Sequence, residues 1–430
     1  MNLSVTEMYP KVFKSNCRQT LYIRLNDLNI QSDLLQIKIQ PMEKYAILHT
    51  KLYRVDEEHR YPYVALTGLG DGLYSVEYDF TVEQKYSVKV KYGDDIICSS
   101  YLYSLDEDLA ALKAYKGDTH LHTCCSDGEQ TPFEAACAYR NAGFDFIAVT
   151  DHHKYAPSLE AKAQMAALTE QFFVVPGEEV HNRAMGYIHI VNFDGDSSVN
   201  ELIETDEDYV NSEIEKILVS RDLSNLSDPY CVAYRIFVAN EIRKRGGIAI
   251  MAHPYWEAYG EYNMQTEEFI YHWQNGDFDA MEVLAGCDAV AIGDGNNLQE
   301  MIRTDLLAEG FKIPLVGASD AHRRVYKYPY DSFNIQFTLV FAKDFSDIKS
   351  AISEERAVAI DRRSDETFRA IGKFRYAKYA RFLMREYFPA YTALTAAHAK
   401  ALSAADGHKT AEILQAERAI DDFKNKFFAV

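Results

Sequence analysis

Residues 144–153 read FDFIAVTDHH, an apolar run that ends in four polar residues. Such a run is typical of a strand buried in a parallel sheet, here interrupted by one charged residue, Asp145. A helix is predicted before it, because Thr131 can cap the N-terminus, Pro132 suits the first turn and Glu134 can close a capping box. A helix leading into a buried strand indicates an α/β fold that delivers polar side chains at strand ends.

The same alternation of strand and helix continues through residues 116–364. The predicted strands are short apolar runs, and the predicted helices lie between them. The further strands are Phe172–Val175, Tyr187–Asn192, Gly247–Ala252, Ala280–Leu284, Ile313–Gly317 and Phe337–Phe341, and the helices include Tyr234–Arg245 and Leu298–Ala308. This order predicts a β/α barrel or a closely related layered α/β fold.

Two segments of different character flank this region. Residues 1–110 show period-two alternation of apolar side chains and polar turns, which predicts a small β-sandwich. Its predicted strands include Leu21–Leu25, Leu35–Ile39, Tyr74–Phe80 and Tyr86–Tyr92. Residues 365–430 are rich in Ala, Lys, Arg and Glu, which predicts a helical extension with a break at 405–407. This extension would pack on the α/β domain or on another subunit, so a homo-oligomer is compatible with the sequence.

The charges are unbalanced, with 45 Lys plus Arg against 65 Asp plus Glu and a formal net charge of −20. Such a chain repels a phosphate backbone, which argues against nucleic-acid binding and favours a small-molecule substrate. The seven cysteines are odd in number and irregularly spaced, as in reduced proteins of the cytoplasm. Residues 1–20 hold no signal-peptide core, and no apolar run is long enough to span a membrane. We therefore expect a cytoplasmic protein without a membrane partner.

Histidines and acids recur where the predicted strands end. Residues two apart in a strand point to the same side, so His120 and His122 can bind one metal ion together. The pair Asp320 and His322 can do the same. The other candidates stand singly on or after a strand. The nine candidate ligands are His120, His122, Asp127, His152, Glu179, His189, His253, Asp320 and His322. A lone histidine is more often a core residue, but six of the chain's 13 histidines share this placement, which argues against coincidence.

The donor types indicate which metals this site would bind. A mixture of neutral imidazole and carboxylate suits zinc, iron or manganese, whereas thiolates alone would indicate structural zinc and oxygen alone magnesium or calcium. Nine ligands are too many for one tetrahedral ion. The sequence therefore predicts two or three divalent ions, with Asp or Glu bridging between them.

These segments resemble the PHP (polymerase and histidinol phosphatase) family of metal-dependent phosphoesterases over about residues 116 to 360. The resemblance implies a distorted (β/α)7 barrel that holds up to three metals. The family's HxH pair falls on His120 and His122, its next acid on Asp127, its TDH histidine on His152, its Glu on Glu179, its lone histidines on His189 and His253, and its closing DxH pair on Asp320 and His322. One residue of register decides between Glu178 and Glu179. The Ser-Asp-Gly at 126–128 resembles the stand-alone branch, and a preceding sandwich resembles members that hydrolyse carbamate or phosphate esters.

The resemblance implies a phosphoesterase that acts on a small phosphorylated metabolite. A water bridging two divalent ions is acidified toward neutral pH, and the resulting hydroxide would attack phosphorus in line. Asp151 is a candidate to orient a neighbouring ligand, or is an ordinary turn residue. Arg183, Arg323 and Arg324 are candidates to hold phosphate oxygens.

Two other functions stay open. The same hydroxide can attack carbon, which would make the chain a metal-dependent carbamate, ester or amide hydrolase. A metal-containing binding or regulatory protein without turnover is the third function, and the complete ligand set counts against it. The remaining histidines of the α/β region, His153, His181 and His272, are bystanders or supply a proton to the leaving oxygen. An arginine aimed at the metals would favour a phosphate substrate, and an apolar pocket floor would favour a neutral ester.

Overall fold

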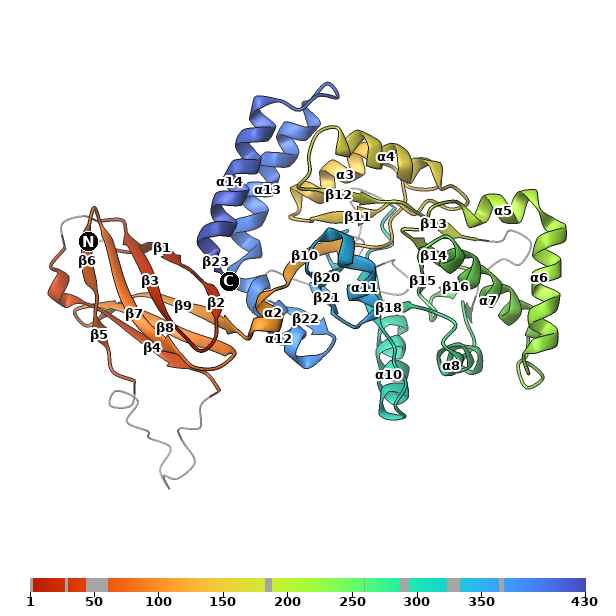
Figure 1. The fold of residues 1–430 in the computed structure, drawn as a ribbon, viewed down its shortest axis with the longest axis horizontal. Coiled ribbons are helices and arrows are strands. Elements are labelled where there is room, and N and C mark those ends of the chain that lie inside the picture. The colour runs from red at the N-terminus through yellow and green to blue at the C-terminus, as the bar shows by residue number, and fades with distance from the viewer. Residues whose placement is uncertain are drawn as a thin grey trace. The chain divides into compact units, whose positions relative to one another are not determined.

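The chain divides into two compact units, drawn in Figure 1. The first contains Met1–Leu112, Arg381–Tyr391 and Arg418–Val430, and the second contains Lys113–Ala380 and Thr392–Glu417. The computed structural model describes residues 3–27, 30–43, 61–181, 188–258, 260–286, 294–322, 333–362 and 367–430. The predicted domain limits near residues 110 and 364 stay predictions.

The first unit is built from two sheets. A four-stranded sheet has the order β1-β3-β7-β6, and a six-stranded sheet has the order β23-β2-β9-β8-β4-β5. Most neighbouring strands are antiparallel, but β2 runs parallel to both β9 and β23. The strands are β1 Val5–Tyr9, β2 Val12–Lys14, β3 Cys17–Leu25, β4 Leu35–Pro41, β5 Val64–Ala65, β6 Thr67–Gly70, β7 Leu73–Phe80, β8 Gln84–Tyr92, β9 Asp95–Leu105 and β23 Phe428–Ala429. A short helix, α2, spans Glu107–Ala110.

The core of this unit confirms the predicted alternation. Leu21 and Ile23 of β3, Ile37 of β4, and Val88 and Val90 of β8 are all fully buried in one apolar cluster. The residues between them in β3 and β8, such as Tyr22 and Lys89, are more exposed, as the pleat of a strand requires. In β4 the intervening Lys38 is itself buried. Two sheets that share an apolar core in this way form a sandwich, the architecture expected from the period-two pattern.

Three helices cover residues 374–427, and each is divided between the two units. They are α12 Phe374–Glu386, α13 Phe388–Ser403 and α14 Ala411–Phe427. Helices α13 and α14 run side by side (Figure 1). The predicted break at residues 405–407 is confirmed, with Gly407 at a φ of 72°.

The described residues of the second unit form two mixed sheets and a small hairpin. A six-stranded sheet has the order β12-β11-β10-β20-β21-β22, and a five-stranded sheet has the order β13-β14-β15-β18-β19. The pairs β10–β11, β11–β12, β15–β18 and β18–β19 are parallel, and the others are antiparallel. The strands are β10 Lys113–Asp118, β11 Phe146–Ala148, β12 Phe173–Val175, β13 Gly177–Val180, β14 Ile190–Phe193, β15 Ile248–Met251, β16 Glu257–Ala258, β17 Glu261–Tyr262, β18 Ala280–Ala285, β19 Leu315–Ala318, β20 Gln336–Ala342, β21 Ala357–Arg362 and β22 Phe368–Ile371.

Helices connect many of these strands, as the alternating pattern predicted. Thr131 caps α3 through its side chain, and Glu134 completes the capping box. The helices are α3 Pro132–Asn141, α4 Ala156–Ala166, α5 Val199–Thr205, α6 Glu207–Ser220, α7 Pro229–Lys244, α8 Thr266–Asn275, α10 Gly295–Ala308 and α11 Ile348–Ser353. Helix α7 carries ten buried residues, so it packs as a largely internal element of the unit.

The predicted (β/α)7 barrel is not confirmed, because the strand ladders of the described residues form two separate open sheets. Two isolated parallel bridges nevertheless link residues that follow β10 and β11 of the six-stranded sheet to residues at the two edge strands, β19 and β13, of the five-stranded sheet. Leu121, just after β10, bridges Ala321, just after β19, and His152, after β11, bridges Glu179 of β13. The two sheets therefore meet at the segments that carry the candidate ligands.

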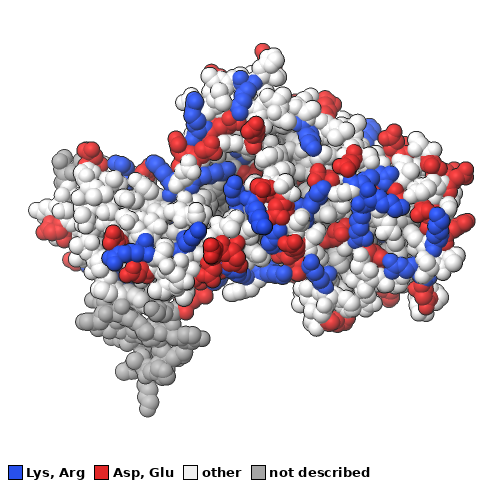
Figure 2. All heavy atoms as spheres, in the orientation of Figure 1, with Lys and Arg blue, Asp and Glu red and all other residues white. Residues whose placement is uncertain are grey.

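The surface drawn in Figure 2 mixes acidic and basic side chains over the face in view. The net charge of −20 is therefore not gathered into one patch on that face. Among the helices of the described part of the chain, none combines the length and apolarity that crossing a membrane requires.

Candidate metal centre

The candidate ligands lie just beyond, or at the ends of, six strands of the second unit. His120 and His122 follow β10 rather than lying within it, which corrects the expectation that the pair sits in a strand. The single bridge at Leu121 keeps their extended alternation, because His122 N donates to Ala321 O and Asp320 N donates to His120 O, both at 2.9 Å. Two backbone hydrogen bonds thus hold the HxH segment against the DxH segment.

All nine predicted ligands fall into four overlapping groups whose ligand atoms lie within 4.8 Å of one another. Each group offers three or four nitrogen or oxygen atoms, as many as a divalent ion needs from protein. The groups are His122, Asp127, His152 and His322; His120, His253 and Asp320; His120, His122 and Glu179; and His152, Glu179 and His189. Because the groups share members, any ions held here would be close neighbours.

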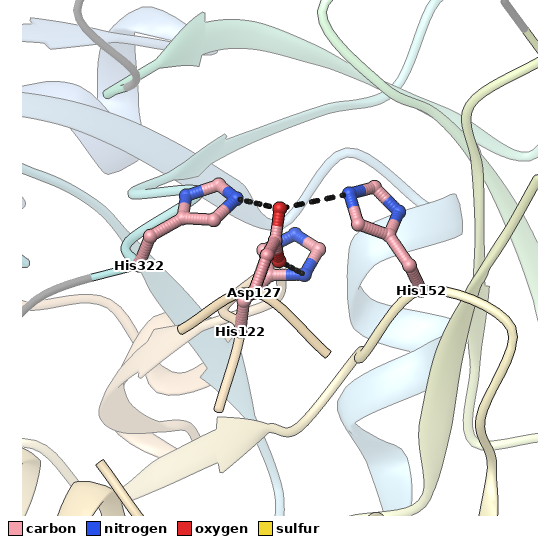
Figure 3. Close-up of side chains that lie close together, drawn as sticks. All are labelled: His122, Asp127, His152 and His322. Carbon is pink, nitrogen blue, oxygen red and sulfur yellow. Dashed lines mark ion pairs between the residues drawn. The ribbon is translucent and has the colours of Figure 1, made fainter. Parts of the chain in front are cut away.

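The first group is arranged around Asp127. Its Oδ2 atom lies 3.4 Å from His322 Nε2 and 3.6 Å from His152 Nε2, and its Oδ1 atom lies 3.5 Å from His122 Nδ1. Figure 3 shows the carboxylate pointing between the imidazoles. Asp127 is half exposed, so this group forms the outer part of the centre.

Glu179 is the central carboxylate, because its two oxygens face different histidines. Oε1 lies 2.6 Å from His189 Nδ1 and 3.4 Å from His253 Nε2. Oε2 lies 2.9 Å from His152 Nδ1, 3.4 Å from His120 Nε2 and 3.5 Å from His122 Nε2. Asp320 is placed similarly, with Oδ1 3.0 Å from His122 Nε2 and Oδ2 3.8 Å from His253 Nε2. This geometry suits bridging carboxylates.

The register of β13 places Glu179, and not Glu178, among these histidines. The Glu178 carboxylate points the other way and accepts hydrogen bonds from Ser198 Oγ at 2.7 Å and Val199 N at 2.6 Å. It also accepts from Asn200 Nδ2 at 2.9 Å. Glu178 therefore anchors the start of α5, while its neighbour faces the centre.

The field of the histidines keeps the acids ionised. Burial favours the neutral acid, yet His189, His120 and His152 hold the pKa of Glu179 well below its usual value. The pKa of Asp320 is likewise lowered despite burial, chiefly by His120 and by a hydrogen bond from His122. Two ionised carboxylates in a buried pocket require positive charge beside them.

The histidines divide into two kinds. Burial lowers the pKa of His122 and His189 to about 4, so both are neutral at pH 7, and His189 adds its charge to the field at Glu179 only at low pH. Burial also acts on His322, but Asp127 and Asp320 outweigh it and raise its pKa to about 9. The pKa of His120 is raised well above its usual value, because Asp320, Glu282 and Glu179 together outweigh burial. In the absence of metal, protons on such histidines supply the positive charge that the carboxylates require.

The donor set fits divalent cations. Nε2 of His120 and Nε2 of His122 approach to 3.1 Å, and Asp320 Oδ1 lies 3.3 Å and 3.0 Å from these two atoms. Facing ring nitrogens and carboxylate oxygens at this spacing are the arrangement that a small cation stabilises. Among the residues that the structure describes, no hydrogen-bond partner is found for the buried His253 Nδ1.

Two candidate ligands occupy a backbone conformation that is uncommon outside glycine. His253 has a φ of 24° and Asp320 a φ of 48°. Non-glycine residues at positive φ store strain, and such strain gathers at functional sites. The surrounding hydrogen bonds therefore hold these two side chains where a relaxed backbone would not.

Within the described part of the chain, the Asp151 carboxylate is hydrogen-bonded to Thr123 and Ser126 rather than to a candidate ligand. The carboxylate accepts from Thr123 N at 2.8 Å, Thr123 Oγ1 at 2.6 Å and Ser126 Oγ at 2.6 Å. It thereby orders the turn between His122 and Asp127. A Cβ on Gly128 would lie 2.6 Å from His122 O, so this turn also requires a glycine at that position.

Sequence reasoning missed Glu282 and Asp118. Glu282 is fully buried and lies 2.7 Å from His120 Nδ1. Asp118 accepts from Ser319 N at 3.0 Å and from the Tyr139 hydroxyl at 2.9 Å, which ties β10 to the DxH segment. The signal for Glu282 was present, because it is the one charged residue in the apolar stretch Ala280–Ala285.

The histidines and arginines that were not predicted as ligands lie beside the centre, away from it or outside the described residues. His181 Nδ1 lies 3.0 Å from His153 Nε2, beside the centre, and His272 lies in α8, 3.0 Å from Asp277. Trp256, also missed, sets its indole ring 5.3 Å from the ring of His189 and 5.5 Å from that of His253. The candidate phosphate-binding residues Arg183, Arg323 and Arg324 lie outside the described residues.

Comparison with known proteins finds similar solved structures at low sequence identity. No protein-family model and no curated protein matches the chain. A solved two-domain protein from Bacteroides vulgatus, named for a predicted PHP-like metal-dependent phosphoesterase, is 20% identical with a TM-score of 0.40 over 58% of this chain and 65% of its own. A candidate metal-dependent phosphoesterase from Bifidobacterium adolescentis is 18% identical with a TM-score of 0.33 (48% and 87% covered). An amidohydrolase from Chromobacterium violaceum is 18% identical with a TM-score of 0.32 (48% and 88% covered). These TM-scores are low, and they do not establish a family for the chain.

Proposed function

We propose that the chain is a metal-dependent hydrolase that cleaves a phosphate ester of a small metabolite. The observation that carries the proposal is the placement of Glu179, whose two oxygens face separate sets of histidines. A carboxylate placed in this way suits adjacent divalent ions, and adjacent ions are the arrangement used to hydrolyse phosphate esters. Zinc, manganese and iron suit this donor set.

The role of the chain's own residues follows from the geometry. Glu179 and Asp320 would hold neighbouring ions at a fixed separation, with His120 and His122 completing the inner part. Divalent ions bound there would supply Lewis acidity and lower the pKa of a water molecule. Asp127 with His152 and His322 would hold the outer part of the centre, next to solvent.

If the centre holds three ions, the balance of charge favours an anionic substrate. The nine ligands include three carboxylates, whereas two or three divalent ions bring four or six positive charges. Glu282 contributes a fourth negative charge, so a centre of three ions stays positive. A positive centre inside a chain of net charge −20 attracts a phosphate group at short range.

A second candidate is a metal-dependent carbamate, ester or amide hydrolase. The observation in its favour is Trp256, whose half-buried indole stands against His189 and His253. An aromatic wall beside the metals suits an uncharged substrate group better than a phosphate.

The finer description of the fold is also a proposal. The seven strands β10, β11, β13, β14, β15, β18 and β19 would form a ring if the single bridges at Leu121 and His152 extended into ladders. Such a ring is the distorted (β/α)7 barrel expected from the sequence. A cytoplasmic location is proposed from the cysteine pattern alone.

The test is hydrolysis of an aryl phosphate and an aryl carbamate by the purified protein with Mn²⁺ or Zn²⁺. We expect phosphatase activity that is lost in His120→Ala and in Asp320→Ala and kept in His408→Ala, which changes an exposed histidine far along the chain. Carbamate turnover alone would favour the second candidate. Bound metal without activity on either substrate would contradict both and favour a binding protein.

A further inference from the structure

Glu282 is a charged residue in an otherwise apolar strand. It lies in β18, whose six residues, Ala280–Ala285, are all buried, and its side chain is fully inaccessible. A buried carboxylate is costly unless hydrogen bonds compensate for lost hydration. The contacts of this side chain therefore indicate what it is there to do.

Both oxygens of Glu282 reach residues predicted to bind metal. Oε1 accepts from His120 Nδ1 at 2.7 Å, and Oε2 accepts from the backbone N–H of His253 at 3.0 Å. His120 and His253 belong to one ligand group with Asp320. One side chain thus joins two of the three members of that group, although they lie more than 130 residues apart in sequence.

The two hydrogen bonds have different consequences. The bond from His120 Nδ1 fixes the proton on that nitrogen, which leaves Nε2 as the atom that faces Glu179 and Asp320. The bond from His253 N secures a residue at a φ of 24°, which is strained for a non-glycine residue. Gln299 of α10 also contacts this part of β18: its Nε2 donates to Glu282 O at 2.9 Å, and its Oε1 accepts from Tyr255 N at 3.4 Å.

We propose that Glu282 is a positioning residue of the metal centre, which fixes the ring orientation of His120 and the backbone of His253 for one divalent ion. The inference rests on the proposed metal-dependent function. Glu282 does not join any of the four ligand groups found among the described residues, so it acts through its two neighbours. Carboxylates that hold a ligating histidine in this way raise its basicity and affect metal affinity.

A plain structural ion pair is the alternative, and a matched variant separates the two roles. Glu282→Gln keeps the size of the side chain but leaves one acceptor oxygen for two donors. Glu268→Gln is the control, because Glu268 is also buried and ionic but pairs with Arg235 and His272 in and beside α8. Both substitutions remove a buried carboxylate, and only the first touches the centre.

The measurement is Co²⁺ affinity and stoichiometry of the full chain, by competition with a chelator and by the visible spectrum of bound Co²⁺. We expect Glu282→Gln to lower the affinity of one site by about 10- to 100-fold, the usual effect of losing such a partner. Glu268→Gln should lower the melting temperature and leave Co²⁺ affinity unchanged. Equal Co²⁺ affinity in Glu282→Gln and wild type, or an equal loss in both variants, would overturn the proposal.

A second measurement determines the protonation of the His120 ring in the wild-type protein, so it does not depend on Glu282→Gln folding. In the Zn²⁺-loaded wild type, ¹⁵N chemical shifts of the His120 ring, identified by their absence in His120→Ala, should report a protonated Nδ1 and a metal-bound Nε2. Metal binding through Nδ1 would refute the assignment. If the wild type binds no divalent ion at all, the proposed function itself fails, which is a different result from binding that is indifferent to Glu282.

Discussion

Metal binding should become tighter as the pH rises from about 6.5 to 8.5, because protons and metal compete for the same histidines. His322 is the clearest case, since Asp127 and Asp320 outweigh burial and raise its pKa to about 9. A raised pKa means that the metal-free imidazole keeps its proton at pH 7. That proton must leave before the ring can bind a cation.

The magnitude follows from the distance between pH 7 and this pKa. Two pH units correspond to about 2.7 kcal/mol, or roughly a 100-fold loss of affinity at pH 7 relative to the fully deprotonated imidazole. Each proton displaced gives roughly a tenfold gain per pH unit in this range. The same proton stabilises the metal-free fold fully below about pH 6.5, and this contribution is lost as the pH rises through 9.

The assay is isothermal titration of the metal-free protein with Mn²⁺ in two buffers of different ionisation enthalpy, which counts the protons released. We expect at least one proton per bound ion at pH 7 and a smaller number at pH 8.5. Asp127→Asn should bind more weakly and release fewer protons, because the His322 pKa would fall. Binding without proton release, or an affinity that is flat with pH, would refute the reasoning.

Three further perturbations test the surroundings of the centre. Gly128→Ala should destabilise the protein by about 1–3 kcal/mol and weaken metal binding, since the new Cβ meets His122 O. The control Gly68→Ala should change neither stability nor metal binding. Urea unfolding measures the stability of both variants, and Co²⁺ titration measures their metal binding. Trp256→Phe should remove most of the tryptophan fluorescence quenching that Co²⁺ causes, because the indole adjoins two candidate ligands, and unchanged quenching would contradict this. Arg140→Ala should cost about 3–5 kcal/mol in urea unfolding, because it leaves the buried Asp145 carboxylate without its 3.5 Å partner; a loss under about 1 kcal/mol would argue against a paired charge there.

The candidate site was predictable from the sequence because most candidate ligands lie next to a predicted strand, often in pairs or short motifs of histidine and acid. Strand ends meet on one edge of a sheet, so His120 and Asp320 could be expected to lie together although 200 positions separate them. The capping residues of α3 were predictable for a similar reason, since Thr131 and Glu134 contact each other locally. Local signals and strand ends were therefore sufficient for much of the site.

Closure of the sheets was not predictable in the same way. Strands β13, β14 and β15 pair antiparallel, yet their apolar runs look the same as those of parallel neighbours such as β18. Direction of pairing depends on how the connecting chain returns, which hydrophobic pattern does not encode. Glu282 was missed because its signal, one acid within a buried apolar strand, is a matter of composition and not of periodicity or motif spacing.

The pairing of β23 with β2 has a consequence for how the protein is made. Phe428 lies beside Val12, so the six-stranded sheet of the sandwich gains this edge strand only after all the residues between these two positions have been synthesised. The N-terminal segment must wait, with the flank of β2 unpaired, while some 300 residues of the second unit are synthesised. A chaperone that shields exposed strand edges would be needed most during that interval, and a gene truncated before α14 would yield a sandwich that never completes its sheet.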